Sequence, residues 1–359
     1  MIMTAETDLK LQIEKRKDSK LPQVDFSNLV FGQVFTDHMF LADYKNNKWE
    51  APKIIPYQAL PYEPSAKVFH YGQAVFEGMK AYKDKDGNIF LFRPEENFER
   101  INRSAQRLGM PPIPKEYFME GLKQLVKLDK DWIPTGEGES LYLRPVYIAI
   151  ENAVAASPST EYRFMIIASP AGKYYVGDVK VKIEDKYSRA CDGGVGFAKA
   201  AGNYAAQFYP TELAKQEGFQ QIIWTDSKEH KYLEEAGTMN MFFRLGDTLV
   251  TAPTDSSRIL PGITRKSIIQ LAKDNGVKVE VRPVTVEEVI EGAKNGNLKE
   301  IFGAGTAATV LPIKGVKYKD FYADLPQLED SYADRFKKLL MDIQYNKTED
   351  PYNWRYEVK

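Results

Sequence analysis

Apolar residues recur along the first half of the chain at two spacings, and these spacings predict both strands and helices. Short runs rich in aromatic and β-branched residues are typical of strands, and apolar residues three or four apart are typical of helices. The predicted strands are 38–44, 141–150 and 162–169, and the predicted helices are 94–107 and 115–129. Asp86-Gly87 lies between two aromatic-rich runs and therefore predicts a hairpin.

The second half of the chain continues this alternation. Its predicted strands are 179–184, 220–226, 278–284 and 300–306, and its predicted helices are 204–216, 265–275, 286–296 and 332–343. Gly276 directly follows one of these helices, as expected of a helix stop. Because hairpins join several strands, we expect an α/β fold with α+β character, built from two domains whose mixed sheets are flanked by helices.

A segment rich in turn-forming residues near the middle of the chain marks the expected domain boundary. Its sequence, SPAGKYYVGD, contains one proline and two glycines between two predicted strands. We therefore expect a smaller N-terminal α/β domain over 1–170, a linker over 171–178, and a larger C-terminal domain over 179–359.

Length and charge narrow the class of protein. With 359 residues the chain can form about two domains. Its 49 basic and 50 acidic residues give a net charge of −1, so nothing draws the whole molecule to nucleic acid or to an anionic membrane. One cysteine excludes an intrachain disulfide, and the three histidines lack zinc-type spacing. No apolar run reaches membrane-spanning length and no targeting segment is recognised, so we expect a cytoplasmic protein.

A glycine-rich stretch, GGVGFAKAAGNY at 193–204, is the first candidate for chemistry. Lys199 lies among small residues, with Tyr204 five positions later. Such a lysine can hold a phosphate or form a Schiff base, but an exposed loop with a solvated lysine would have the same sequence. The dinucleotide and Walker patterns both fail, because the third glycine is missing and alanines flank Lys199.

Three further turns contain a glycine one or two positions before a threonine. LPGITR (260–265) opens a predicted helix, where the N–H groups of Ile263 and Thr264 could bind an anion. FGAGTA (302–307) ends a strand at Thr306, and EEAGTMN (234–240) places acidic residues before a tight turn. Together with Lys199 and Arg100, these turns indicate the surroundings of a phosphorylated cofactor.

In these stretches the sequence resembles the branched-chain amino acid aminotransferases, which are class IV (fold type IV) enzymes that use pyridoxal 5'-phosphate. The matching stretches follow in one order: FGQVFTDHM, HYGQAVFEGMKAY, LFRPEENFERINRSAQRL, LYLRP, GGVGFAKAAGNY, EEAGTMN, LPGITR, FGAGTAA and IQYN. The resemblance implies reversible ping-pong transamination of leucine, isoleucine and valine with 2-oxoglutarate. It also implies a cofactor at the domain interface and a homodimer that acts on amino acids and 2-oxo acids.

The resemblance also assigns roles to individual residues. Lys199 would form the Schiff base and move the proton, Tyr204 would bond the ring oxygen of the cofactor, and Glu235 would hold the pyridine nitrogen protonated. The implied cofactor-binding residues are Lys199, Arg100, Tyr204, Glu235, Thr238, Ile263, Thr264 and Thr306. The implied substrate-binding residues are Phe31, Tyr71, Phe76, Tyr142, Arg144, Tyr174, Thr238 and Ala307.

One stretch departs from the family pattern. Some members carry C-x-x-C after the G-T-A turn, whereas this chain has Ala308-Thr309-Val310-Leu311, so thiol regulation is not expected there.

A D-amino acid aminotransferase or an aminodeoxychorismate lyase of the same fold is the nearest alternative function. Neither is expected to match FGQVFTDHM and LFRPEENFER as well. A non-catalytic nucleotide-binding module is the third possibility, and the failed phosphate motifs count against it.

Overall fold

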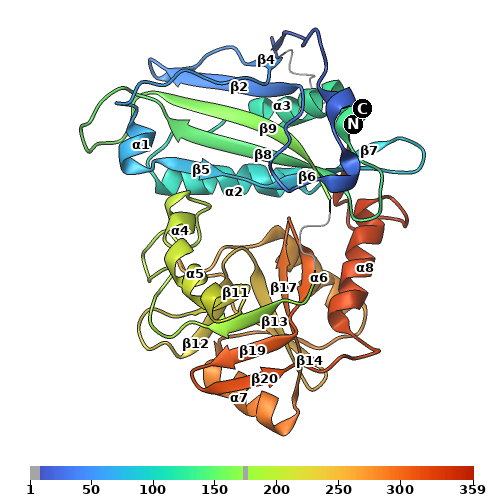
Figure 1. The fold of residues 1–359 in the computed structure, drawn as a ribbon. Helices are drawn as coiled ribbons and strands as arrows, with labels where there is room; N and C mark the ends of the chain where they lie inside the picture. The colour runs from blue at the N-terminus through green and yellow to red at the C-terminus, as the bar shows by residue number, and fades with distance from the viewer. Residues whose placement is uncertain (1–8, 173–176) are drawn as a thin grey trace, which may run out of the picture. The chain divides into compact units, whose positions relative to one another are not determined.

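A computed structural model describes residues 9–172 and 177–359 of the chain, and it divides them into two compact units. The first unit contains residues 9–172 together with 344–359, and the second contains residues 177–343. Both are mixed α/β structures, each built on one sheet with helices packed against it (Figure 1). The expected fold class is therefore confirmed.

In the described part of the first unit, ten strands form one sheet. Their order is β1 (Gln12–Ile13), β4 (Lys53–Pro56), β2 (His38–Lys45), β9 (Tyr162–Ala171), β8 (Ser140–Ala149), β6 (Met79–Lys83), β7 (Ile89–Phe92) and β21 (Arg355–Glu357), with β3 (Lys48–Trp49) beside β2 and β5 (Ala74–Phe76) beside β8. The helices are α1 (Lys67–Tyr71), α2 (Pro94–Arg107) and α3 (Lys115–Leu128), and 3-10 turns span Leu21–Gln23, Phe26–Asn28 and Lys130–Trp132. Among the described strands of this sheet, only β1 and β4 pair in parallel.

The core of the first unit joins this sheet to its helices. Phe118 of α3 stacks on Phe164 of β9 with ring centroids 5.9 Å apart, and Phe40 of β2 meets the edge of Phe164. Ile101 of α2 is fully buried in the same cluster. Burial of rings and branched side chains at these helical and strand spacings is what the sequence pattern predicts, and it supplies most of the unit's stabilisation.

The predicted hairpin at Asp86-Gly87 joins β6 to β7. Gly87 has φ +85°, which favours glycine because the residue has no Cβ to clash. The Asp84 carboxylate accepts hydrogen bonds from the Asp86 and Asn88 N–H groups at 2.9 and 2.8 Å, so the turn is fixed by a side chain at its own start.

In the described part of the second unit, eleven strands form the sheet. Their order is β15 (Val279–Val281), β14 (Thr248–Thr251), β13 (Asn240–Leu245), β12 (Tyr232–Ala236), β11 (Gln221–Thr225), β10 (Lys180–Ile183), β19 (Gly315–Tyr318) and β20 (Phe321–Asp324), with β16 (Val284–Thr285) beside β12, and β17 (Leu298–Gly305) beside β13 and β18 (Thr309–Pro312). The helices are α4 (Gly202–Ala205), α5 (Phe208–Gln216), α6 (Ile263–Asp274), α7 (Val286–Asn295) and α8 (Tyr332–Gln344). Parallel and antiparallel pairs occur together, so this sheet is mixed.

Two parts of the fold differ from the sequence-based expectation. The helix expected over 204–216 is divided into α4 and α5, and Pro210 lies in the first turn of α5, where its missing N–H costs no helical bond. The C-terminal segment, expected within 179–359, belongs to the first unit, because β21 pairs with β7 and thereby covers that strand. Residues 173–176 of the expected linker lie outside the described residues.

Candidate active site

Lys199 lies in the second unit, on the loop between β10 and α4. Its Nζ donates a 2.8 Å hydrogen bond to the Oη of Tyr204 in α4, so these two predicted cofactor-binding residues are in contact. Asn203 fixes the loop by donating to the carbonyls of Val195 and Ala198, both at 2.9 Å. The Lys199 amine is thus held by the phenol of Tyr204, and the loop that carries Lys199 is anchored by Asn203.

Gly196 shows why this loop is made of small residues. A Cβ at this position would come within 2.3 Å of the Arg258 carbonyl oxygen and 2.5 Å of the Ala190 Cβ. Close approach of two backbone segments therefore requires glycine here. The glycine-rich pattern is explained in part by packing, before any ligand is considered.

Pairing of three strands brings the predicted residues of two turns together. Glu235 of β12 lies opposite Asn240 of β13, and Asn240 in turn lies opposite Ala304 of β17. The tight turn that contains Thr238 joins β12 to β13, and Thr306 directly follows β17. A Cβ on Gly305 would lie 2.9 Å from the Thr238 carbonyl oxygen, so these two turns touch.

Glu235 is buried, and donors from three segments surround its carboxylate. Arg189 Nη2 lies 2.9 Å from Oε1, while Asn240 Nδ2 and the Leu260 N–H donate to Oε2 at 3.0 and 3.1 Å. Burial raises the pKa of Glu235 to about 7, opposed by the charges of Arg189 and Lys199 and by the Leu260 N–H. A carboxyl that titrates near neutrality is suited to hold or share a proton.

Glu234, the neighbouring acid, is held by a different group. Its carboxylate accepts a hydrogen bond from Arg258 Nε, and Arg258 also pairs with Asp192. Successive residues of a strand point to opposite faces of the sheet. Of the two adjacent acids, Glu235 forms the close ion pair with Arg189, whereas Glu234 pairs with Arg258.

The titration of Glu235 predicts how stability depends on pH. Its ordinary pKa is 4.5 and its folded pKa is about 7, so the folded chain binds this proton more tightly than the unfolded chain. Stability from this group is complete below pH 4.5 and is lost as pH rises to about 7, by roughly 3 kcal/mol. Urea unfolding measures the free energy of unfolding of the ligand-free protein and of Glu235→Gln. The excess of the unmodified protein over the variant should fall as pH rises through this range. An excess that stays constant with pH would contradict the prediction.

Helix α6 begins directly at the predicted anion-binding turn. Its N-cap is Gly262, which has no side chain to bond the first N–H groups, and Ile263 and Thr264 follow as its first two residues. Both are buried. Backbone N–H groups at such a helix start bind anions well, because they lack partners within the helix and lie at the positive end of its dipole.

Four predicted substrate residues form one cluster in the first unit. Phe31 meets the edge of Tyr142 with ring centroids 4.8 Å apart. The Arg144 guanidinium lies 4.7 Å above the Phe76 ring, and its Nη2 donates a 3.0 Å hydrogen bond to Tyr142 Oη. Within the described residues, no carboxylate lies within ion-pair distance of Arg144, and its buried Nε has no hydrogen-bond acceptor. A cation held between aromatic rings in this way is available to an anionic group.

Arg100, predicted to anchor phosphate, is a buried residue of α2 in the first unit. Its Nε and Nη2 each donate at 2.7 Å to the fully buried carboxylate of Glu77. Tyr71 is exposed on α1 and bonds the Val154 carbonyl. Ala307 lies in the turn after β17, whereas Tyr174 lies outside the described residues.

Sequence reasoning missed three polar residues with buried side chains beside the predicted ones. They are Glu77, Arg189 and Asn240. Asn240 stands at the end of the EEAGTMN turn and could have been found there, because a tight hairpin after Glu235 places it opposite that residue. Arg189 lies ten positions before Lys199 in an irregular loop, and no local pattern marks it.

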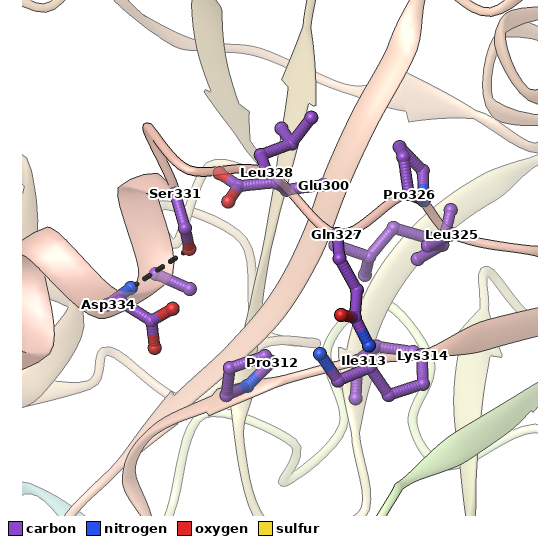
Figure 2. Close-up of a pocket in the computed structure, with 12 residues that line it drawn as sticks. Glu300, Pro312, Ile313, Lys314, Leu325, Pro326, Gln327, Leu328, Ser331 and Asp334 are labelled. Carbon is purple, nitrogen blue, oxygen red and sulfur yellow. Dashed lines mark hydrogen bonds between the residues drawn. The ribbon is translucent and has the colours of Figure 1, made fainter.

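A separate cavity of about 200 Å³ lies at the other end of β17, between that strand and the start of α8 (Figure 2). Two of its polar side chains bond the start of the helix: both oxygens of Glu300 accept from the Tyr332 N–H, at 3.0 and 2.9 Å, and Ser331 Oγ accepts from the Asp334 N–H at 3.1 Å. None of the predicted site residues lines it. These bonds cap α8, which gives Glu300 and Ser331 a structural role.

Residues 9–172 and 177–359 contain neither a cluster of metal-binding side chains nor a helix that could span a membrane. No group of three or more histidine, cysteine, aspartate or glutamate side chains in these ranges could hold a metal ion. Nor does any helix in them have the length and apolar character needed to cross a membrane.

Comparison with known proteins places this arrangement in a known group. Residues 74–316 match the sequence profile of the family described as amino-transferase class IV. A probable branched-chain-amino-acid aminotransferase of Staphylococcus epidermidis is 47% identical over 355 residues, which cover 97% of this chain and 98% of that protein. Branched-chain-amino-acid transaminase 1 of Bacillus subtilis is 45% identical over 341 residues, covering 93% of this chain and 95% of that protein.

One solved structure illustrates the shared fold. The branched-chain amino acid aminotransferase of Thermobaculum terrenum, crystallised in its PLP form, superposes with a TM-score of 0.74. The match covers 89% of this chain and 98% of that one, at 21% sequence identity.

Proposed function

Because the chain belongs to the class IV aminotransferase family, we propose that it transfers amino groups reversibly between leucine, isoleucine or valine and 2-oxoglutarate. The observation that carries the proposal is an amine and a buried carboxyl in one unit: Lys199 Nζ, held by Tyr204 Oη, and Glu235. This pair is what a pyridoxal-phosphate enzyme needs at the two reactive positions of its cofactor.

The residues present fit pyridoxal 5'-phosphate by their chemistry. Lys199 offers a primary amine for a Schiff base, and Glu235 offers a carboxyl that can hold a proton at a ring nitrogen. The start of α6 offers N–H groups for the phosphate. When bound, the cofactor supplies an electron sink for negative charge at the substrate Cα.

The chain's own residues then have separate tasks. Lys199 Nζ is the base that accepts the proton from the substrate Cα, and the hydrogen bond to Tyr204 Oη orients this amine. Glu235 would hold the proton on the ring nitrogen, because a nearby carboxylate favours the protonated form of a pyridine. Arg100, kept in place by Glu77, and Thr306 are assigned to the phosphate, as are Ile263 and Thr264.

Both half-reactions use the same substrate pocket, which must accept an apolar branched side chain and then the side chain of glutamate. We assign the apolar wall to Phe76, Tyr71 and Tyr142. We assign the side-chain carboxylate of glutamate to Arg144, whose guanidinium is stacked on Phe76 and oriented by Tyr142. An ion pair between Arg144 and this carboxylate would bind glutamate, while the aromatic rings still offer an apolar surface to a branched side chain.

Arg144→Ala should therefore separate the two half-reactions. Loss of one charged hydrogen-bonding partner costs about 1.5–3 kcal/mol, which lowers kcat/KM for glutamate roughly tenfold to a hundredfold. The half-reaction with leucine should change much less. Single-turnover rates with each amino acid measure this, and Arg144→Lys should recover part of the glutamate rate. Equal losses with both substrates would remove the assignment.

A substrate panel tests the proposed reaction. Purified protein supplied with 2-oxoglutarate should convert L-leucine, L-isoleucine and L-valine to their 2-oxo acids, with glutamate formed in equal amount. D-Alanine should give no product. Turnover of D-alanine without turnover of L-leucine would favour a D-amino acid aminotransferase instead.

A cytoplasmic homodimer is part of the same proposal, and sedimentation of the purified protein tests its dimeric state.

A further inference from the structure

The carboxylate of Glu235 is oriented by residues that lie outside its own strand. Arg189, on the loop after β10, contacts Oε1 at 2.9 Å. Asn240, the first residue of β13, donates to Oε2 at 3.0 Å, and the Leu260 N–H donates to the same oxygen at 3.1 Å. Because donors from different segments hold both oxygens, the carboxylate has one preferred orientation.

Asn240 also joins this carboxylate to the start of α6. Its Nδ2 donates a second hydrogen bond, to the Leu260 carbonyl at 2.9 Å. Its Oδ1 lies against Gly262, where a Cβ would come within 2.0 Å of that oxygen. Gly262 is the N-cap of α6. One buried side chain thus contacts both the partner of the ring nitrogen and the turn assigned to the phosphate.

Arg189 provides the positive charge on the other side of Glu235. Its side chain is 4% exposed, and its Nη2 also donates to the carbonyls of Gly196, at 2.9 Å, and Arg258. Gly196 lies three positions before Lys199. Arg189 therefore joins the loop that carries Lys199 to the carboxylate of Glu235. A buried cation beside a buried carboxylate favours the ionised form of that carboxylate.

We propose that Asn240 and Arg189 are positioning residues for the cofactor: they hold the Glu235 carboxylate in one orientation beside a positive charge, and Asn240 fixes it relative to the phosphate turn at α6. The inference rests on the proposed function. The charges and donors that act on the Glu235 carboxylate are Arg189, Lys199, the Asn240 amide, the Leu260 N–H and, through its charge, the neighbouring Glu234. When Asn240 fixes the distance between Glu235 and the turn at α6 before binding, these two groups bind a rigid ligand with a smaller loss of conformational entropy.

Asn240→Asp tests this directly, because it keeps the shape of the side chain and replaces the donor with a second carboxyl beside Glu235. Two adjacent carboxyls do not both ionise readily, so they share one proton at low pH and repel each other at high pH. We expect the affinity of the cofactor-free protein for pyridoxal phosphate to fall at least tenfold at pH 8. It should recover as pH is lowered towards 5, whereas the unmodified protein shows no such recovery.

Asn275→Asp is the matched control, since Asn275 lies at the opposite end of α6 and donates to the Leu271 carbonyl at 2.8 Å. It should bind pyridoxal phosphate like the unmodified protein. If Asn240→Asp does not fold, as circular dichroism would show, Asn240→Ser removes the same bonds without adding charge. That variant should lose at least tenfold in affinity, with no recovery at low pH.

Arg189→Met and Arg189→Lys test the second residue. The first should lower kcat at least tenfold, and the second should retain most of the rate because it keeps the charge. If Asn240→Asp binds the cofactor like the unmodified protein, or equally weakly at every pH, the positioning role of Asn240 is wrong. Failure of the unmodified protein to bind pyridoxal phosphate would instead overturn the proposed function.

Discussion

Lys199→Ala should abolish transamination, lowering the rate of leucine turnover by roughly three orders of magnitude or more. The variant loses the amine that Tyr204 Oη orients, and with it both the covalent bond to the cofactor and the base that moves the Cα proton. Absorbance spectroscopy of the purified variant should show no Schiff-base band. Stopped assays with leucine and 2-oxoglutarate measure the rate.

Two further variants test whether the Lys199 amine is needed for its reactivity or only for its positive charge, and whether loss of any lysine has the same effect. Lys199→Arg keeps a positive side chain but cannot form a Schiff base, so it should be as inactive as the alanine variant. Lys215→Ala removes an exposed lysine of α5 and should keep full activity. A Lys199→Ala protein that retains the band or the turnover would refute the role of Lys199.

Glu235→Gln should lower the turnover rate by roughly a hundredfold while the Schiff-base band remains. The amide oxygen can still accept the hydrogen bonds from Asn240 and Leu260, although the contact of Arg189 with the second carboxylate oxygen is lost. It has no negative charge, however, and cannot hold a proton on the ring nitrogen. Steady-state rates and circular dichroism, measured on the same preparation, test the two parts of this expectation.

Glu234→Gln is the matched comparison, because Glu234 is the adjacent acid on the same strand and is held by Arg258 instead. Its loss of rate should be much smaller than that of Glu235→Gln. Equal losses would mean that the two carboxylates act as one network. Turnover of Glu235→Gln at the unmodified rate would rule out Glu235 as the partner of the ring nitrogen.

Much of the fold follows from local pattern, and the exceptions have physical causes. The helix at 94–107 and the hairpin at Asp86-Gly87 are set by apolar spacing and turn chemistry close in sequence, so they were predicted correctly. The short strands β18 to β20 and the C-terminal β21 have no such pattern. They depend on partners elsewhere in the chain, as β21 does on β7.

The candidate site divides in the same way. Lys199 and Glu235 stand in stretches whose order along the chain carries the resemblance, and in the structure Lys199 bonds Tyr204, another residue of the same stretch. Arg189 and Glu77 cannot be recognised as site residues from the sequence, because each contacts a residue distant in sequence, Glu235 and Arg100 respectively. A single buried charge has no periodicity, and only the folded chain reveals its partner.

The most direct measurement of the central claim is to reduce the purified protein with borohydride and to locate the modified residue by peptide mass spectrometry. Reduction fixes a Schiff base as a stable bond to the lysine that formed it. We predict a phosphopyridoxyl group on the peptide that contains Lys199 and on no other lysine peptide. An unmodified Lys199, or modification of a different lysine, would contradict the account.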